Sequence, residues 1–138
     1  MRFELATPTR QLVSTEADEV VAPGSEGYFG VLPGHAAFLT TLGCGEVMYR
    51  QGRDEHHLAV MGGFAEVSND RVIILAERAE RPEEIDRDRA ERARQRAEQR
   101  LTGRGARGHE EEIDYARALA ALQRAQARIQ VVGGKAGH

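Results

Sequence analysis

Apolar and polar residues alternate over short stretches in the first half of the chain, as they do in half-buried β-strands. The stretches recur about every ten residues and are separated by Gly, Pro, Asn and Asp, which favour turns. Because the gaps leave no room for crossover helices, the strands should pair antiparallel in a sandwich or a flattened barrel. The predicted strands are residues 3–6, 12–15, 20–22, 47–50, 58–61, 64–67 and 71–75.

The period of the apolar residues changes at Pro82 from two to the spacing of three and four that helices show. Pro82 followed by Glu83 and Glu84 predicts a helix start, because proline needs no donor there and acids favour the positive end of the dipole. The helix should end in the glycine-containing segment 102–105. Its narrow apolar side consists of Ala90, Ala93, Ala97 and Leu101.

A second helix is predicted to start near Asp114, which suits an N-cap. Its apolar side has alternating spacings of three and four and consists of Tyr115, Ala118, Leu122, Ala125, Ile129 and Val132. The two helices should be antiparallel, and since their seams are mostly alanine, little apolar area is buried and the hairpin should be able to open. The predicted fold class is α+β, mainly β: an antiparallel β-sandwich domain at 1–82 followed by a two-helix antiparallel hairpin domain at 83–138.

The segment 21–35, VAPGSEGYFGVLPGH, contains four glycines and two prolines and is predicted to form successive tight turns. It is not a phosphate-binding loop, because no Gly-Lys-Ser/Thr follows and Pro33 stands where a nucleotide-binding helix should begin. The aromatic pair Tyr28 and Phe29, beside Glu26, should either fold back onto the core or be offered to a partner. The similar segment 43–45, Gly-Cys-Gly, is predicted to be another turn.

Composition narrows the functional classes. Of the 138 residues, 41% are apolar, enough for one compact domain with an appendage, and six of the seven aromatics precede residue 65. The charge is −5 over residues 1–82 and +2 over residues 83–138, so neither part has the positive balance of a nonspecific nucleic-acid binder.

Cys44 is the only cysteine, which excludes an intrachain disulfide and favours a reducing compartment. The sequence shows no signal peptide and no membrane span.

No catalytic constellation and no metal site is predicted. His56 and His57 lie in a predicted strand, where neighbours point to opposite faces and cannot chelate one ion together. Cys44 has no orienting third group for nucleophilic catalysis and is predicted to be structural.

Arginines recur on one side of each predicted helix. Asp86, Arg89, Arg92 and Arg96 form a stripe on the first helix, and Arg117, Arg124 and Arg128 form one on the second. Facing arginines repel unless an anion lies between them, and guanidinium groups suit phosphate oxygens. The alternative is that they are solvated and paired along the same helix with Glu83, Asp88, Glu91 and Glu98.

Several motifs together resemble the epsilon subunit of bacterial F-type ATP synthases, and the resemblance covers nearly the whole chain. The matching motifs, in the order and spacing of that family, are PGSEG at 23–27, GVLPGH at 30–35, GGFAEV at 62–67, AERA at 76–79, IDRDRA at 85–90 and DYARA at 114–118. The resemblance implies a β-sandwich that rests on the c-ring and binds the gamma subunit, with Glu26, Tyr28, Phe29 and His35 as docking residues. It implies a non-catalytic rotor subunit of the central stalk, peripheral to the cytoplasmic face of the bacterial inner membrane.

The resemblance also implies a regulatory role for the hairpin. Folded against the sandwich it permits turnover, and extended along gamma it meets the alpha and beta subunits and inhibits ATP hydrolysis. No cofactor is required, and ATP is implied as a regulatory ligand and not as a substrate. Ile85 and Asp86 would contact the adenine end of the nucleotide, and Arg89 would hold the turn of the chain there or contact the ribose-phosphate side. Arg96, Arg124 and Arg128 would contact phosphates, and Glu80 would complete the site.

Two other functional classes remain open from the residues alone. The first is an arginine-rich helical adaptor that binds nucleic acid or an acidic protein, against which the interleaved acids argue. The second is an enzyme, which ranks lower because the sequence lacks a nucleophile motif, a metal cluster and a cofactor loop.

Overall fold

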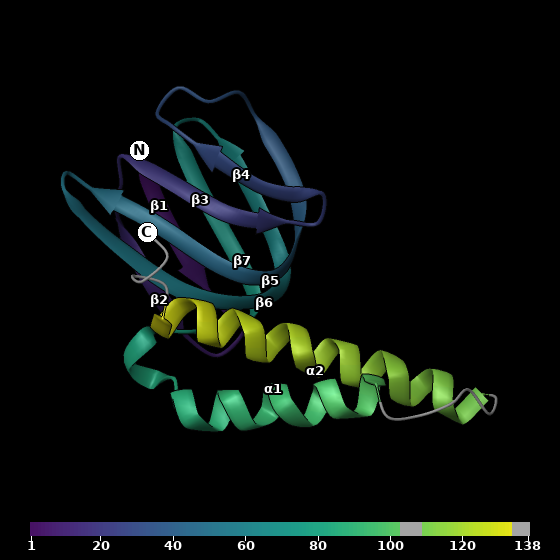
Figure 1. Cartoon of the computed structure of the whole chain (residues 1–138). Coiled ribbons are helices and arrows are strands. Elements are labelled where there is room, and N and C mark those ends of the chain that lie inside the picture. The colour runs from purple at the N-terminus through teal and green to yellow at the C-terminus, as the bar shows by residue number, and fades with distance from the viewer. Residues whose placement is uncertain (103–108, 134–138) are drawn as a thin grey trace.

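A seven-stranded sheet that curls over a shared core forms the larger part of the molecule, and two helices lie along one side of it (Figure 1). The computed structural model describes residues 1–102 and 109–133. The strand order is β2-β1-β7-β6-β5-β3-β4. The elements are β1 (Arg2–Ala6), β2 (Gln11–Glu16), β3 (Glu19–Gly24), β4 (Gly27–Val31), β5 (Phe38–Gln51), β6 (Asp54–Ser68), β7 (Arg71–Glu80), a 3-10 turn η1 (Pro82–Glu84), α1 (Arg87–Thr102) and α2 (His109–Gly133). The predicted α+β, mainly β class is confirmed.

One strand pair departs from the expected antiparallel arrangement. β1 runs parallel to β7, with Phe3 opposite Val72 and Leu5 opposite Ile74. The expectation rested on the short gaps between consecutive strands. These two strands are the first and the last along the chain, and all the other strands lie between them in sequence, so their parallel pairing needs no crossover helix.

The glycine-rich segment 21–35 was expected to be a run of turns, which holds at 25–26 and 33–34 and is wrong for the rest. It contains most of a β-hairpin, in which β3 pairs with β4 and Ala22 lies opposite Phe29. Only Gly27 and Gly34 in this segment have positive φ, 123° and 86°. The other glycines lie in or next to extended strands, where the lack of a side chain does not produce a turn.

The Gly-Cys-Gly turn predicted at 43–45 is also wrong, because Cys44 lies within β5, opposite Met61 of β6. The strands predicted at 58–61 and 64–67 are two parts of one strand, β6. Residues 52–53 and 69–70 form the turns that connect β5 to β6 and β6 to β7. Asn69 and Asp70 have φ of 53° and 60° in the β6–β7 turn, the left-handed conformation that Asn and Asp tolerate best after glycine.

Two consecutive glycines reverse which face of β6 is buried in the sandwich. Leu58 and Val60 point into the sandwich core before them, and Ala65 and Val67 after them, so the alternation changes phase. Gly62 and Gly63 make this possible with φ of 75° and 122°, which other residues rarely adopt. As a result, the opposite face of β6 before the glycines presents Ala59 and Met61 to the helices.

The helices form an antiparallel pair in which α2 lies between the sandwich and α1 (Figure 1). α1 begins at Arg87, after the turn η1, rather than at Pro82, and α2 begins at His109, five residues before the predicted Asp114 cap. The loop predicted between the helices lies largely outside the described residues, as does the tail from residue 134.

α2 has two apolar faces where the sequence suggested one. Ala118 and Ala125, expected in the helix seam, are buried, and so are Ala90 and Ala97 of α1. Ala127 and Val131 are buried as well, and Val131 packs with Ala59, Met61 and the half-buried Ile85. The apolar contact between hairpin and sandwich is therefore small.

Candidate functional site

A pocket of about 440 Å³ lies where β7, the segment 84–86 and both helices meet. Its lining includes all seven residues that the resemblance implied for a nucleotide site, although these are 48 positions apart at the extremes. They are Glu80, Ile85, Asp86, Arg89, Arg96, Arg124 and Arg128, and the further lining residues are Arg78, Glu84, Ala90 and Ala93. The fold thus brings the seven residues together around one opening.

An ion pair with two hydrogen bonds joins the hairpin to the sandwich at the pocket. Arg128 of α2 donates two hydrogen bonds to Glu80 at the end of β7, from Nε to Oε1 at 2.7 Å and from Nη2 to Oε2 at 3.0 Å. Both side chains are about three-quarters shielded from solvent. The hydrogen bond to Glu80 raises the pKa of Arg128 above its ordinary value, so the Arg128 guanidinium keeps its charge.

Asp86 caps the first helix. Its Oδ1 accepts a hydrogen bond from the backbone N–H of Arg89 at 3.1 Å, and its backbone carbonyl accepts one from the N–H of Ala90 at 3.0 Å. These two bonds satisfy donors that the first turn of a helix otherwise leaves open. Asp86 therefore orients Arg89 and Ile85 at this end of the pocket.

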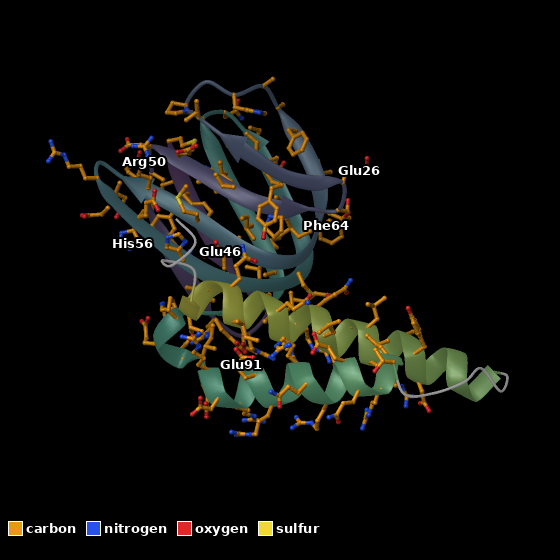
Figure 2. The ribbon with its side chains drawn as sticks, viewed as in Figure 1. Glu26, Glu46, Arg50, His56, Phe64 and Glu91 are labelled. Carbon is orange, nitrogen blue, oxygen red and sulfur yellow. The ribbon has the colours of Figure 1, made fainter. Side chains whose placement is uncertain are left out.

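Four of the five arginines that line the pocket have no carboxylate within 4.0 Å among the residues that the structure describes: Arg78, Arg89, Arg96 and Arg124. Of the acids beside them, Glu80 is bound by Arg128, Glu84 by Arg10, and Asp86 caps α1. Glu91 (Figure 2) and Glu98, expected as partners of the stripe, both bind Arg94 instead, at 2.9 and 2.8 Å. The pocket thus has an excess of positive charge suited to an anion such as phosphate.

Hydrogen bonds hold the segment 81–84, which leads into the helices, to the edge of the sandwich. Arg10 donates from Nη1 to Glu84 Oε2 at 2.6 Å and from Nη2 to Glu84 Oε1 at 2.8 Å. The backbone N–H of Arg81 donates to Glu84 as well, and the Arg81 guanidinium donates to the carbonyl of Leu12 at 2.9 Å. These contacts fix the position at which the hairpin leaves the sandwich.

The Glu84 contacts predict a dependence of stability on acid pH. The hydrogen bond from Arg10 lowers the Glu84 pKa from 4.5 to about 2, so its ionised form stabilises the folded state above pH 4.5 and this contribution is lost as the pH falls towards 2. We expect Glu84→Gln to lower the free energy of unfolding slightly at neutral pH, since the pair is partly exposed. In denaturant titrations the difference from wild type should vanish between pH 4.5 and 2. A difference that persists below that interval would contradict this prediction.

The four residues expected to dock onto a partner lie on or near the β3–β4 hairpin. Glu26, at its turn, and His35, after β4, are exposed. Tyr28 is 53% exposed, although its hydroxyl accepts a hydrogen bond from the backbone N–H of Glu46 at 3.0 Å. Phe29 is folded back and packs against Phe38, with ring centroids 5.1 Å apart. Glu26, Tyr28 and His35 therefore remain available to a partner, whereas Phe29 is half-buried.

An exposed apolar strip, which the sequence did not indicate, runs across β5, β6 and β7 and consists of Leu39, Phe64 and Leu75. Their exposed fractions are 71%, 56% and 57%. Phe64 and Leu75 are opposite each other in the sheet, and Phe64 is opposite Thr41, which bonds Ser25 of the β3–β4 turn. Figure 2 shows Phe64 and Glu26 on the same side of the sandwich, away from His56. The strip is thus continuous with the exposed tip of the β3–β4 hairpin, and knowledge of the strand register would have revealed it.

The two histidines of β6 serve different contacts on opposite faces. His56 stacks on Tyr49 at 4.7 Å, and His57 Nδ1 lies 2.9 Å from Glu46 Oε2. Glu46 lies on the sheet next to α2 (Figure 2), where Gln130 Nε2 donates a hydrogen bond to its Oε1 at 3.4 Å. Among the side chains described over residues 1–102 and 114–133, no group of three or more His, Cys, Asp or Glu is arranged to hold a metal ion. No helix in the described part of the chain is long and apolar enough to cross a membrane.

Comparison with known proteins places the chain in a family. Residues 1–82 match the family described as ATP synthase, Delta/Epsilon chain, beta-sandwich domain, and residues 83–133 match ATP synthase, Delta/Epsilon chain, long alpha-helix domain. The chain belongs to the ATP synthase delta/epsilon family. Proteins named ATP synthase epsilon chain from Nitratidesulfovibrio vulgaris (strain DP4) and ATP synthase epsilon chain 2 from Syntrophotalea carbinolica are each 52% identical to it over 101 residues. The aligned part is 73% of this chain and 75% and 73% of theirs. The resemblance to the epsilon subunit is therefore confirmed.

Solved ATP synthase structures share the fold of this epsilon-type chain. A chain in the Euglena gracilis mitochondrial ATP synthase (OSCP/F1/c-ring) matches with a TM-score of 0.79 at 22% identity, over 99% of this chain and 80% of that one. A chain in the Tetrahymena thermophila mitochondrial ATP synthase central stalk and c-ring matches with 0.61 at 14% identity, over 93% and 95%. At these identities the likeness concerns the fold.

Proposed function

We propose that the protein is a non-catalytic subunit of the central stalk of a proton-translocating F-type ATP synthase, peripheral to the cytoplasmic face of the bacterial inner membrane. The sandwich couples rotation of the c-ring through the gamma subunit to the catalytic head. The exposed strip Leu39, Phe64 and Leu75 supports this proposal, because a partner that covers large apolar side chains removes them from water and this stabilises the complex. The β3–β4 tip beside it, with Glu26 and Tyr28, supplies polar groups at the edge of the same surface.

We further propose that the helices are a mobile brake on ATP hydrolysis. In the folded form described here α2 covers Ala59 and Met61, and the brake is released. When the hairpin extends, its helices would meet the alpha and beta subunits and block hydrolysis. The observation that carries this proposal is the small contact between hairpin and sandwich, in which Ala59, Met61 and Val131 are the buried apolar side chains and the Arg128–Glu80 pair is the main polar link. A contact of this size can be broken and remade.

ATP would act on this equilibrium as a regulatory ligand. The pocket exists only while β7, α1 and α2 lie together, so an anion bound there stabilises the folded hairpin by mass action. Plentiful ATP would thus weaken inhibition without being hydrolysed at this site.

Removal of the hairpin tests the brake. We expect truncation after Pro82 to raise ATP hydrolysis by the assembled complex several-fold while ATP-driven proton pumping stays coupled, because the strip and the β3–β4 tip are untouched. The measurement compares hydrolysis and proton pumping of membranes with wild-type and truncated chains at equal subunit content. Unchanged hydrolysis would count against a brake, and uncoupled pumping would show that the sandwich alone does not transmit rotation.

A further inference from the structure

A second pocket of about 470 Å³ adjoins the first one, and Arg78 and Arg124 are the two residues that line both. The lining of the second pocket is otherwise supplied by β5, β6, β7 and α2 and includes Met61 and Gln123. Ile85 and Asp86 line only the first pocket. Arg78 and Arg124 therefore mark the end of the first pocket that is far from the segment 84–86.

The chemistry of the first pocket changes along this direction. Ile85, Ala90 and Ala93 give it an apolar part beside the start of α1, which suits the flat face of a base. The other end carries Arg78 and Arg124, and no carboxylate lies within 4.0 Å of either among the described residues. A ligand with a base at one end and a chain of phosphates at the other matches this polarity.

Arg78 differs from the other pocket arginines in its origin. It lies on β7 opposite Met61, two residues before Glu80, so it projects from the face of the sheet that α2 covers. Arg89 and Arg96 come from α1, and Arg124 and Arg128 from α2. Among the described lining residues, Arg78 is the cation that the sandwich itself contributes.

We propose that Arg78 binds the terminal phosphate of a nucleoside triphosphate together with Arg124. The bound triphosphate then links the β-sandwich to α2 directly, in addition to the Arg128–Glu80 pair. A diphosphate is one phosphate shorter and stops before Arg78, so Arg78 distinguishes ATP from ADP. This inference rests on the proposed regulatory binding of ATP.

Calorimetric titration of the full-length chain with ATP and with ADP tests the role of Arg78. We expect Arg78→Ala to weaken ATP binding about tenfold or more, the usual effect of losing a charge-assisted hydrogen bond, and to leave ADP binding within about twofold. Arg78→Lys should restore part of the ATP affinity, since it keeps the charge. Arg71→Ala is the matched control, because Arg71 is an exposed arginine at the other end of β7.

The outcomes separate this inference from the proposal on which it rests. Suppose that the wild type binds ATP and that Arg78→Ala either leaves the ATP affinity unchanged or weakens ATP and ADP binding equally. Either result would overturn the role of Arg78 and leave regulatory ATP binding standing. Wild type that binds no ATP would overturn both. If Arg78→Ala fails to fold by circular dichroism, the ratio of ATP to ADP affinity in Arg78→Lys decides, because a purely structural effect changes both affinities alike.

Discussion

Replacement of Gly63 by alanine is expected to destabilise the β-sandwich by about 3 kcal/mol, a large fraction of the stability of a typical domain. Gly63 has φ of 122°, where a side chain is strained. A Cβ at this position would overlap the carbonyl oxygen of Leu75 and lie 2.7 Å from the Cα of Ala76. Both are backbone atoms of β7, so no side chain can move aside to relieve the overlap.

The measurement is denaturant unfolding of the purified full-length chain, followed by circular dichroism. Gly52→Ala is the matched control, since Gly52 also has positive φ, 61°, but a Cβ there meets nothing within 4 Å. It should cost about 1 kcal/mol, the conformational strain alone. Equal losses for the two variants would contradict the argument that the close approach of β7 requires glycine. A loss at Gly63 would also release the hairpin, because Gly62 and Gly63 create the face that holds α2.

Replacement of Arg124 by alanine is expected to weaken ATP binding about a hundredfold, so that no heat is measured at accessible ATP concentrations. Arg124 lies at the cationic end of the pocket and is half-buried, which strengthens its attraction for phosphate. No carboxylate among the described residues lies within 4.0 Å of it, so its removal leaves no buried charge without a partner. The thermal stability of the ligand-free chain should therefore stay unchanged.

Two further variants sharpen this test. Arg128→Ala should reduce both ATP binding and the stability of the ligand-free hairpin, because it strips Glu80 of its two hydrogen bonds. Arg117→Ala should change neither, since Arg117 is an exposed arginine of α2 outside the pocket. Titration calorimetry and thermal unfolding of the three variants provide both readouts. A wild-type chain without binding heat at about 1 mM ATP would refute the nucleotide site itself.

The fold class could be predicted from the sequence because alternation and helical spacing are local properties. The pattern located strands around Phe3, Val20, Val47 and Val72, and it showed where the helical part begins. It failed at β4 and at Cys44, where glycines beside apolar residues resembled turns. Whether a glycine turns the chain or continues a strand depends on whether another strand pairs with it, and that partner is far away in the sequence.

Some residues of the candidate site could likewise be predicted from the sequence, and others could not. The arginine stripes and the motif from Ile85 to Ala90 could be read from the sequence, and the structure brings part of them to one pocket. The residues of this set that line it are Ile85, Asp86, Arg89, Ala90, Arg96, Arg124 and Arg128, whereas Arg92 and Arg117 do not line it. Arg78 stands in the motif AERA at 76–79 but was missed as a site residue, because nothing in its own strand shows that a helix covers it. Its significance arises only because α2 lies over the face of the sheet that carries it. The strip formed by Phe64 and Leu75 was missed for a similar reason, since it depends on strand register.

The sequence by itself determined the two-part organisation, the family and the positions of the charged residues, because these depend on residue type and on spacing along the chain. Only the tertiary structure decided which charges neutralise each other. Arg128 is paired with Glu80 and Glu84 with Arg10, which leaves Arg78, Arg89, Arg96 and Arg124 for an anion. Ion pairing depends on separations of a few ångströms between side chains that are up to 74 residues apart, and packing alone sets those separations.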